Sequence, residues 1–285
     1  MARALTAALL VLAVCSGTAA DAAPAPDTAE VRRFADELFS QGDWFRASTE
    51  YLRAASYDPG ASDARELGFK AALCAYRAGQ WAEARRRLLD LARVSATELA
   101  DRCRYLGAAS SYRLEDYETA RLLAAQVAPG SPVFDRASYL GGLSDLNLER
   151  WPDARAAFGA VPPGSSLASS AAGLAGLTDR GPDLPRRSPW VTAGLSAVVP
   201  GLGQIVSGYV WDGLSALLLT GGSAAILAAG VDRDNAALKG TGAVLLAIFY
   251  PANVYGGANA AGRRNREARR RLLDDAARRS TLSLE

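Results

Sequence analysis

A short pattern recurs at nearly constant spacing through the first half of this chain of 285 residues. It runs from a glycine or acidic residue, through an aromatic residue, to an alanine, and its copies end at Ala47, Ala84, Ala120 and Ala154. These alanines lie 37, 36 and 34 residues apart. Repetition near this period is typical of stacked helix pairs, each packing on its neighbours instead of sharing one globular core. The repetition therefore predicts an all-α solenoid, a fold class that usually binds other proteins.

The first unit shows how each pair of helices is built. Val31, Ala35 and Leu38 recur at helical spacing, so they lie on one face of a first helix. Gly42 follows this helix in the position of a C-terminal glycine, and Pro59 follows the second helix, which a proline cannot continue. The pattern predicts two amphipathic helices joined by a short turn.

Small residues fall where such helices must approach closely. Ala35, Ala47, Ala54 and the closing Pro59 match the small eighth, twentieth and twenty-seventh positions and the final proline of the tetratricopeptide repeat, which the unit resembles. The resemblance covers Thr28 to Thr178 as four units and a capping helix from Ser166. The second unit keeps the pattern at Ala72, Gly79, Trp81 and Ala84. The third keeps it at Ala108, Tyr117 and Ala120, and the fourth at Gly142, Trp151, Ala154 and Phe158.

This resemblance implies that ligands bind in a concave groove lined by the first helices. The residues that the register places there are aromatic or cationic: Arg32, Phe39, Phe69, Tyr76, Arg77, Arg102, Tyr105, Tyr112, Arg113, Arg136 and Tyr139, with Asp36 and Asn147 beside them. Such a surface would hold a protein or peptide segment by stacking and by pairing of arginines with acidic groups. The alternative is that the tyrosines only pad contacts between helices and the arginines only solvate a face.

The N-terminus has the pattern of an export signal. Arg3 precedes an apolar run from Ala4 to Val14, and small residues follow, which predicts a signal peptide over residues 1–20 and a disordered leader over 21–27. Cys15 leaves a lipoprotein signal as an alternative, although Val14 is an unusual residue directly before a lipidated cysteine.

The composition changes at a Pro-rich charged linker, residues 179–189. Beyond it, residues 190–208, 213–231 and 240–262 carry no charge, and each is long enough to cross a bilayer. They predict a small α-helical transmembrane bundle over residues 190–262, with Trp190, Trp211 and Tyr255 among its interfacial anchors. A buried helical hairpin of a soluble protein is the alternative.

The first of these segments contains a helix-breaking run, Pro200-Gly201-Leu202-Gly203-Gln204. Freed backbone groups in a membrane need protein or water around them, so the segment is expected to be kinked, re-entrant or central in the bundle. Gln204, Asn253 and Asn259 are the polar groups at membrane depth, and hydrogen bonding between helices or a ligand or ion path would each explain them.

Residues 188–265 resemble a bacterial membrane domain with an S-A-x-x-P-G-x-G-Q signature. The match runs from Ser196 through Pro200, Gly201, Gly203 and Gln204, and Val206 stands where the family usually has a tyrosine. The resemblance implies a bacterial inner-membrane location and brings no activity with it.

Charge suggests how the chain crosses the membrane. The tail at 263–285, called here the basic tail, contains eight arginines, and arginine concentrates on the cytoplasmic side. An exported repeat domain and a cytoplasmic tail require an odd number of crossings, and three spans satisfy this. Arg186 and Arg187 argue against three spans, because they would then lie outside. If the first segment does not cross, both groups of arginines can lie inside, but the repeats are then cytoplasmic and the export signal has no explanation.

The composition gives little support to catalysis. The chain has no histidine, only three cysteines, and no recognisable nucleotide loop or metal-ligand cluster, so we expect no enzyme activity and no cofactor. Cys74 and Cys103 are expected to be buried and unbonded, and nucleic-acid binding is not expected. The sequence predicts a membrane-anchored adaptor that contacts lipid and a protein partner and is able to oligomerise through its bundle. The alternatives are an accessory transporter, channel or secretion subunit and a purely structural role.

Overall fold

The computed structural model describes residues 27–57, 59–60 and 63–282, and every regular element in these ranges is an α-helix. The predicted fold class, an all-α array of helix pairs followed by a small bundle of apolar helices, is therefore confirmed. The export signal, most of the leader and Cys15 lie outside the described residues.

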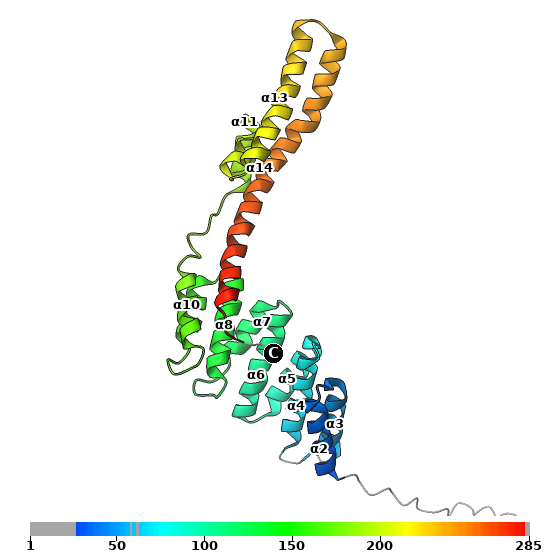
Figure 1. The fold of residues 1–285 in the computed structure, drawn as a ribbon, viewed down its shortest axis with the longest axis vertical. Coiled ribbons are helices and arrows are strands. Elements are labelled where there is room, and N and C mark those ends of the chain that lie inside the picture. The colour runs from blue at the N-terminus through cyan, green and yellow to red at the C-terminus, as the bar shows by residue number, and fades with distance from the viewer. Residues whose placement is uncertain (1–26, 58, 61–62, 283–285) are drawn as a thin grey trace, which may run out of the picture. The chain divides into compact units, whose positions relative to one another are not determined.

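The chain divides into two compact units, one ending at Leu114 and the other beginning at Glu115. The helices of the first unit are α2 (Thr28–Ser40), α3 (Trp44–Tyr57), α4 (Ala64–Arg77), α5 (Trp81–Val94) and α6 (Thr97–Arg113). The helices of the second unit are α7 (Tyr117–Ala125), α8 (Phe134–Asn147), α9 (Trp151–Gly159), α10 (Ala168–Thr178), α11 (Pro189–Val198), α12 (Leu202–Val206), α13 (Val210–Asp232) and α14 (Ala236–Arg279) (Figure 1).

One turn recurs after the first helix of each repeat. Its second residue has a left-handed backbone, with φ of 78° at Gly42, 75° at Gly79, 60° at Glu115 and 59° at Glu149. The next backbone N–H reaches back to a carbonyl five residues earlier, as in the 3.0 Å bond from Asp43 to Leu38, which closes the helix end. Each turn is followed by the aromatic residue that begins the next helix. The sequence repeat is therefore a repeated turn, and glycine occupies it in the first two copies.

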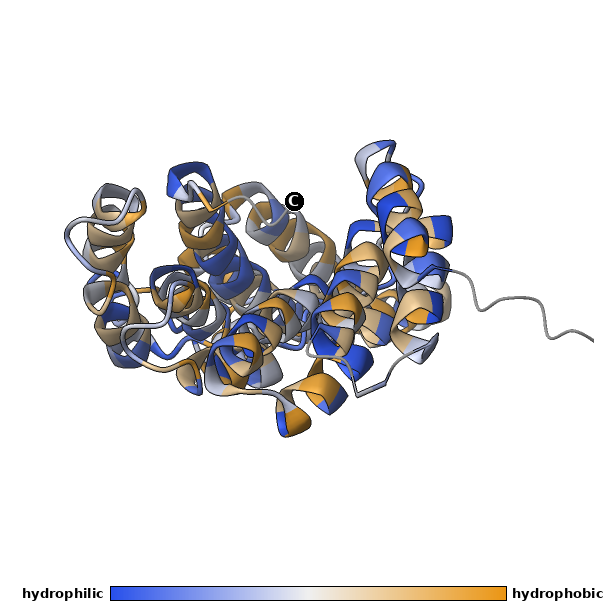
Figure 2. Ribbon diagram, turned by 90° about the horizontal axis from the view of Figure 1, so that it is seen from below, coloured by the Kyte–Doolittle hydropathy of each residue, from blue (hydrophilic) through white to orange (hydrophobic). Residues whose placement is uncertain are grey.

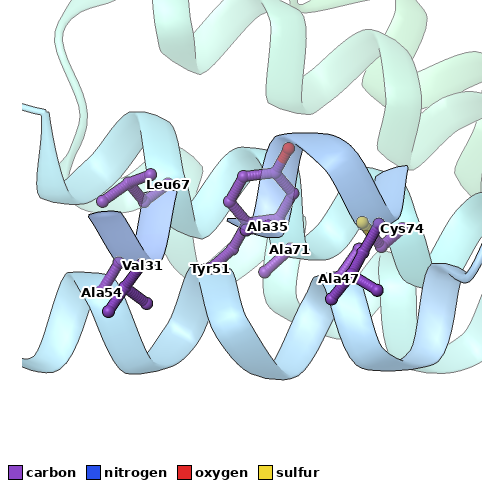
Figure 3. Close-up of a cluster of buried hydrophobic side chains, with 9 residues drawn as sticks. Val31, Ala35, Ala47, Tyr51, Ala54, Leu67, Ala71 and Cys74 are labelled. Carbon is purple, nitrogen blue, oxygen red and sulfur yellow. The ribbon is translucent and has the colours of Figure 1, made fainter. Parts of the chain in front are cut away.

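The core of the first unit joins α2, α3 and α4. Ala35 and Ala47 are fully buried, and their small side chains allow the helices to approach closely (Figure 3). The Tyr51 ring is also buried there, and its hydroxyl donates a 2.6 Å hydrogen bond to Asp36 at the edge of the core. Polar residues cover the other faces, so hydrophilic and hydrophobic residues alternate around the repeat helices (Figure 2).

The repeats of the second unit pack larger groups against glycine. The rings of Tyr139 and Phe158 meet edge to face at 5.5 Å. A Cβ atom on Gly142 would lie 2.7 Å from the Phe158 ring, so a side chain at this position would displace it. This contact explains why α8 has glycine where the other first helices have alanine.

In the apolar helices of the second unit, small and polar residues are buried and large apolar residues are exposed, the reverse of the repeats. Helices α13 and α14 are long and apolar enough to cross a membrane, and little of their apolar stretches is buried. The residues of α13 that are buried are small or polar: Gly213, Thr220, Ser223 and Gly230. Leucines point outward, and Leu218 is 74% exposed. A water-soluble hairpin buries its leucines, so this distribution disfavours the soluble alternative.

The first predicted membrane segment is two short helices instead of one span. Helix α11 ends at Val198, and the chain turns at Pro200 and Gly201 into α12. Before α11, the backbone of Arg187 exchanges two 2.9 Å hydrogen bonds with Asn265 of α14. After α12, the Tyr209 hydroxyl donates to Glu267 of α14 at 2.7 Å. The segment therefore begins and ends beside the same short stretch of α14.

The basic tail continues α14 to Arg279 and lies beside α8 and α10 (Figure 1). Arg269 pairs with Glu149 at 3.0 Å and donates to the carbonyl of Asn147 at 2.6 Å. Arg180, which follows α10, pairs with Asp275 at 3.3 Å. These bonds hold the tail, as far as Asp275, against the residues that follow α8 and α10.

Candidate functional site

The helix break between α11 and α12 is held by three polar side chains. Asn253 of α14 accepts a 2.7 Å hydrogen bond from the backbone N–H of Gly201 and donates one of 2.7 Å to the carbonyl of Ser196. Gln204 donates to the backbone carbonyl of Asn253 at 3.1 Å and accepts from the Ser196 hydroxyl at 2.7 Å. The Ser196 hydroxyl also accepts from the N–H of Gly203 at 3.0 Å. The break thus has internal partners for the groups that it frees.

Glycine is required around this network because backbones pass very close to it. A Cβ on Gly201 would lie 2.0 Å from the carbonyl oxygen of Gly213, and Gly201 also has a φ of 84°. A Cβ on Gly203 would lie 2.0 Å from the carbonyl oxygen of Thr192. The glycines of the signature therefore bring α11, α12 and α13 into contact, and Pro200 begins the turn between them.

This hydrogen-bond network accounts for the buried polar residues Gln204 and Asn253. Ser196, Gln204 and Asn253 are each nearly fully buried. The side chains of Ser196 and Gln204 hydrogen bond to each other, and all three side chains hydrogen bond to backbone groups. Hydrogen bonding between helices thus accounts for Gln204 and Asn253. No observation in the described part of the chain favours an ion path through them. Sequence reasoning had not assigned Ser196 a role, although its place in the signature was the available signal.

The predicted groove arginines of the first unit link neighbouring helices. Arg102 of α6 makes two hydrogen bonds, of 3.0 and 2.9 Å, to Glu66 of α4 and lies 4.3 Å above the Phe69 ring. Arg32 pairs with Asp63 at the start of α4. Arg113 lies 5.9 Å from the ring of Trp81. These contacts hold the stack together, so the structural alternative accounts for part of the predicted surface.

Burial corrects the prediction for three aromatic residues. Phe69, Tyr76 and Tyr139 are all buried, so their rings are not available to stack on a partner. Phe39 is partly buried and packs edge to face on Trp44 with ring centroids 5.0 Å apart. Besides Phe39, the residues of the predicted groove that keep exposed or half-buried side chains are Arg32, Arg77, Arg102, Tyr105, Tyr112, Arg113 and Arg136.

Tyr139 shows what the face of one first helix already binds. Its hydroxyl meets the Ser280 hydroxyl at 3.3 Å and accepts a 3.3 Å hydrogen bond from the backbone N–H of Thr281. Ser170 of α10 completes the contact by donating to the carbonyl of Arg279 at 2.6 Å. In repeat register, Tyr139 of α8 corresponds to Tyr105 of α6, 34 residues earlier. The end of α14 is thus bound at a predicted groove position.

A buried carboxylate of α8 escaped sequence reasoning. Asp145 is 4% exposed, and burial raises its pKa to about 6 although Arg121 of α7, 3.6 Å away, acts to lower it. Its position among apolar repeat residues gave no signal, because the same spacing fits an exposed helix face. The group affects stability, as discussed below, and has no chemical partner that would make it catalytic.

The two buried cysteines behave as predicted. Cys74 and Cys103 are free and fully buried, and burial raises the pKa of each thiol to about 12, which leaves them unreactive. Within residues 27–57, 59–60 and 63–282, no group of histidine, cysteine or acidic residues has the arrangement of a metal site. Comparisons with protein-family models, with curated proteins and with solved structures found no match to this chain.

Proposed function

We propose that this protein is a membrane-anchored, non-catalytic adaptor whose helical repeats bind a protein or peptide segment at the bacterial cell envelope. The observation that carries the proposal is the occupied face of α8, where Tyr139 and the carbonyl of Asn147 contact the end of α14. Helix α6 presents Tyr105 and Arg113 at the equivalent register positions. We therefore infer that a segment of another protein binds along α6 as the C-terminal segment binds along α8.

The inverted burial of α13 and α14 supports membrane anchoring. The uncharged stretch of α13, residues 213–231, would span roughly 28 Å as a helix, close to the hydrocarbon thickness of about 30 Å. Trp211 at one end of this stretch is 81% exposed, as suits an interfacial aromatic residue, and Asp232 and Arg233 follow the other end.

The topology that fits these contacts has two crossings. Helices α13 and α14 form the crossing hairpin, and α11 and α12 enter and leave the bilayer on one side, as Arg187 and Tyr209 indicate by bonding to neighbouring residues of α14. The repeats and the basic tail then share one side, with only the turn around Asp234 on the other. We place the shared side outside the cytoplasm, because the N-terminus has an export signal, and the arginines of the tail oppose this choice.

Accessibility of single cysteines tests the topology. With the native cysteines replaced by alanine, single-cysteine variants Asn235→Cys and Ser280→Cys are each treated in intact cells with a thiol reagent that does not cross the inner membrane. We expect labelling at residue 280 and protection at residue 235. The reverse result would move the repeats into the cytoplasm, and labelling at neither or both positions would overturn the two-crossing arrangement.

Site-specific crosslinking tests the adaptor role. A photoreactive residue at position 77, which is exposed on α4, should capture a partner in intact cells, and the adduct should be lost when Tyr105→Ala is added. Arg93→Glu is the matched control, because Arg93 is 76% exposed on the second helix α5 and lies outside the predicted groove. Adducts that persist in the Tyr105→Ala variant, or that disappear equally in the control, would contradict binding along the first helices.

A further inference from the structure

An apolar groove runs between α11 and α14 on the surface of the bundle. Its walls are apolar or aromatic and include Trp190 and Ala193 from α11 and Pro251, Val254 and Tyr255 from α14, and its volume is about 540 Å³. The rings at its mouth are open to the surroundings, since Trp190 is 87% exposed and Tyr255 is 72% exposed. A groove of this composition suits a hydrocarbon chain and offers almost no hydrogen-bonding group.

A second pocket, of about 320 Å³, lies farther along α14, between α14, the linker and the turn after α8. Its charged and amide lining residues are Arg186 from the linker, Asn265, Arg266 and Arg269 from α14, and Glu149 from the turn after α8. Ala258 of the apolar groove and Asn265 of this pocket are seven residues apart on α14, which is roughly 10 Å along a helix. The cationic pocket therefore adjoins the end of the groove where Trp190 begins α11.

Two of these arginines have no anionic partner. Arg269 is occupied by Glu149, whereas neither Arg186 nor Arg266 forms an ion pair with any described residue. Specific contacts form the wall of this pocket, because two hydrogen bonds between the backbone of Arg187 and the side chain of Asn265 fix the linker against α14. Arg186 and Arg266 both line this pocket.

We propose that the two pockets together bind an anionic phospholipid, with its phosphate between Arg186 and Arg266 and one acyl chain in the groove below Trp190. Guanidinium groups form strong charge-assisted hydrogen bonds with phosphate, and basic pockets between membrane helices are suited to anionic headgroups. The spacing of the pockets selects a molecule that carries both parts, which a free phosphate ion lacks. The proposal rests on the membrane insertion proposed above.

Native mass spectrometry of the full chain in a non-ionic detergent tests this site. Dioleoyl phosphatidylglycerol should bind about tenfold more tightly than dioleoyl phosphatidylcholine, and inorganic phosphate at the same concentration should give no adduct. Arg186→Gln with Arg266→Gln should abolish the preference. Arg270→Gln with Arg271→Gln, which removes equal charge from exposed positions of α14 outside the pocket, should leave it unchanged.

A groove-filling variant provides an independent measurement. Ala193→Phe should weaken binding of both lipids without changing their ratio, because it obstructs the chain and leaves the arginines in place. Equal binding of the two lipids by the parent, or an unchanged preference in the Arg186→Gln, Arg266→Gln variant, would overturn the lipid site. Whether the parent chain remains with membranes after alkaline extraction is scored separately, so failure of membrane insertion is distinguishable from failure of the lipid site.

Discussion

The repeats and the apolar bundle bury opposite kinds of residue. In the repeats, Ala35, Leu88 and Tyr51 are buried and charged residues face outward. In the bundle, Ser196, Gln204 and Asn253 are buried, and large apolar residues such as Leu218 face outward. The repeats are therefore stabilised by removal of apolar surface from water, whereas the contacts between the bundle helices bury small and polar residues.

Small residues also have different roles in the repeats and in the bundle. Alanines in the repeats let amphipathic helices approach while large residues elsewhere fill the core. Glycines in the bundle let backbones themselves make contact, as Gly201 does with Gly213. In the membrane arrangement proposed above, close packing and interhelical hydrogen bonds provide the association energy that the hydrophobic effect does not supply between helices surrounded by lipid. The bundle should consequently tolerate changes on its surface and fail at its glycines.

Replacing a contact glycine should give the largest effect. Gly203→Ala would place a Cβ 2.0 Å from the Thr192 carbonyl oxygen, where the clash is with backbone and has no flexible side chain to relieve it. We expect loss of the folded bundle, measured as aggregation of the detergent-solubilised chain on size-exclusion chromatography. Gly222→Ala is the control, since a Cβ there meets nothing within 4 Å. Equal elution profiles for the two variants would contradict the packing described.

The same leucine-to-alanine change should separate the two regions by several kcal/mol. Leu88→Ala removes a fully buried side chain of α5 and should cost about 2–5 kcal/mol. Leu218→Ala removes a side chain that is 74% exposed, and in detergent it should cost less than about 1 kcal/mol, because lipid-like tails solvate leucine as well as protein does. Thermal unfolding of the full chain, followed by circular dichroism, measures both. A larger effect at Leu218 would reverse the comparison.

Buried polar groups offer a third contrast, because the repeats contain a buried carboxylate where the bundle uses neutral amides and hydroxyls. The folded pKa of Asp145, about 6, lies above the unfolded value of about 3.9, so the folded state binds this proton more tightly. The stability that it contributes is present below about pH 4 and is lost as the pH rises through 6. Relative to Asp145→Asn, the parent should lose about 2–3 kcal/mol between pH 4 and pH 7.

Denaturant unfolding at the two pH values provides this measurement, with an Asp153→Asn variant as a control for an exposed acid at the start of α9. A constant difference between parent and Asp145→Asn across the pH range would show that the carboxyl titrates normally in the folded state.

The sequence predicted the repeats well because their signal is local. The periodic alanines and the glycine turns set helix lengths and pairing, and these are decided by neighbouring residues. The contact faces were harder to predict. Tyr139 has the register of a groove residue, yet the end of α14, more than a hundred residues later, covers it. A local pattern contains no information about such long-range contacts.

The sequence predicted which segments of the bundle are apolar, but not how the first of them folds. Uncharged stretches of sufficient length indicated three membrane segments, and the break at Pro200 indicated irregularity in the first. Whether that segment crosses depends on Asn265 and Glu267, which bind both of its flanks from a distant helix. The arginines of the tail predicted a cytoplasmic location, and charge alone does not reveal that one of them, Arg269, pairs with Glu149 of the repeats.

The repeated turn provides the smallest and sharpest test. Glu115 adopts a φ of 60° at the position where the first unit has Gly42 and Gly79. A side chain in this conformation costs about 1–2 kcal/mol, part of which glycine returns through its greater freedom in the unfolded chain. Glu115→Gly should therefore stabilise the protein by about 0.5–1 kcal/mol, a rise in melting temperature of roughly 1–4 °C. Glu149→Gly should gain less, because it relieves the same strain at a φ of 59° but removes the partner of Arg269. If both variants were stabilised equally, the ion pair that joins the basic tail to the repeats would contribute nothing.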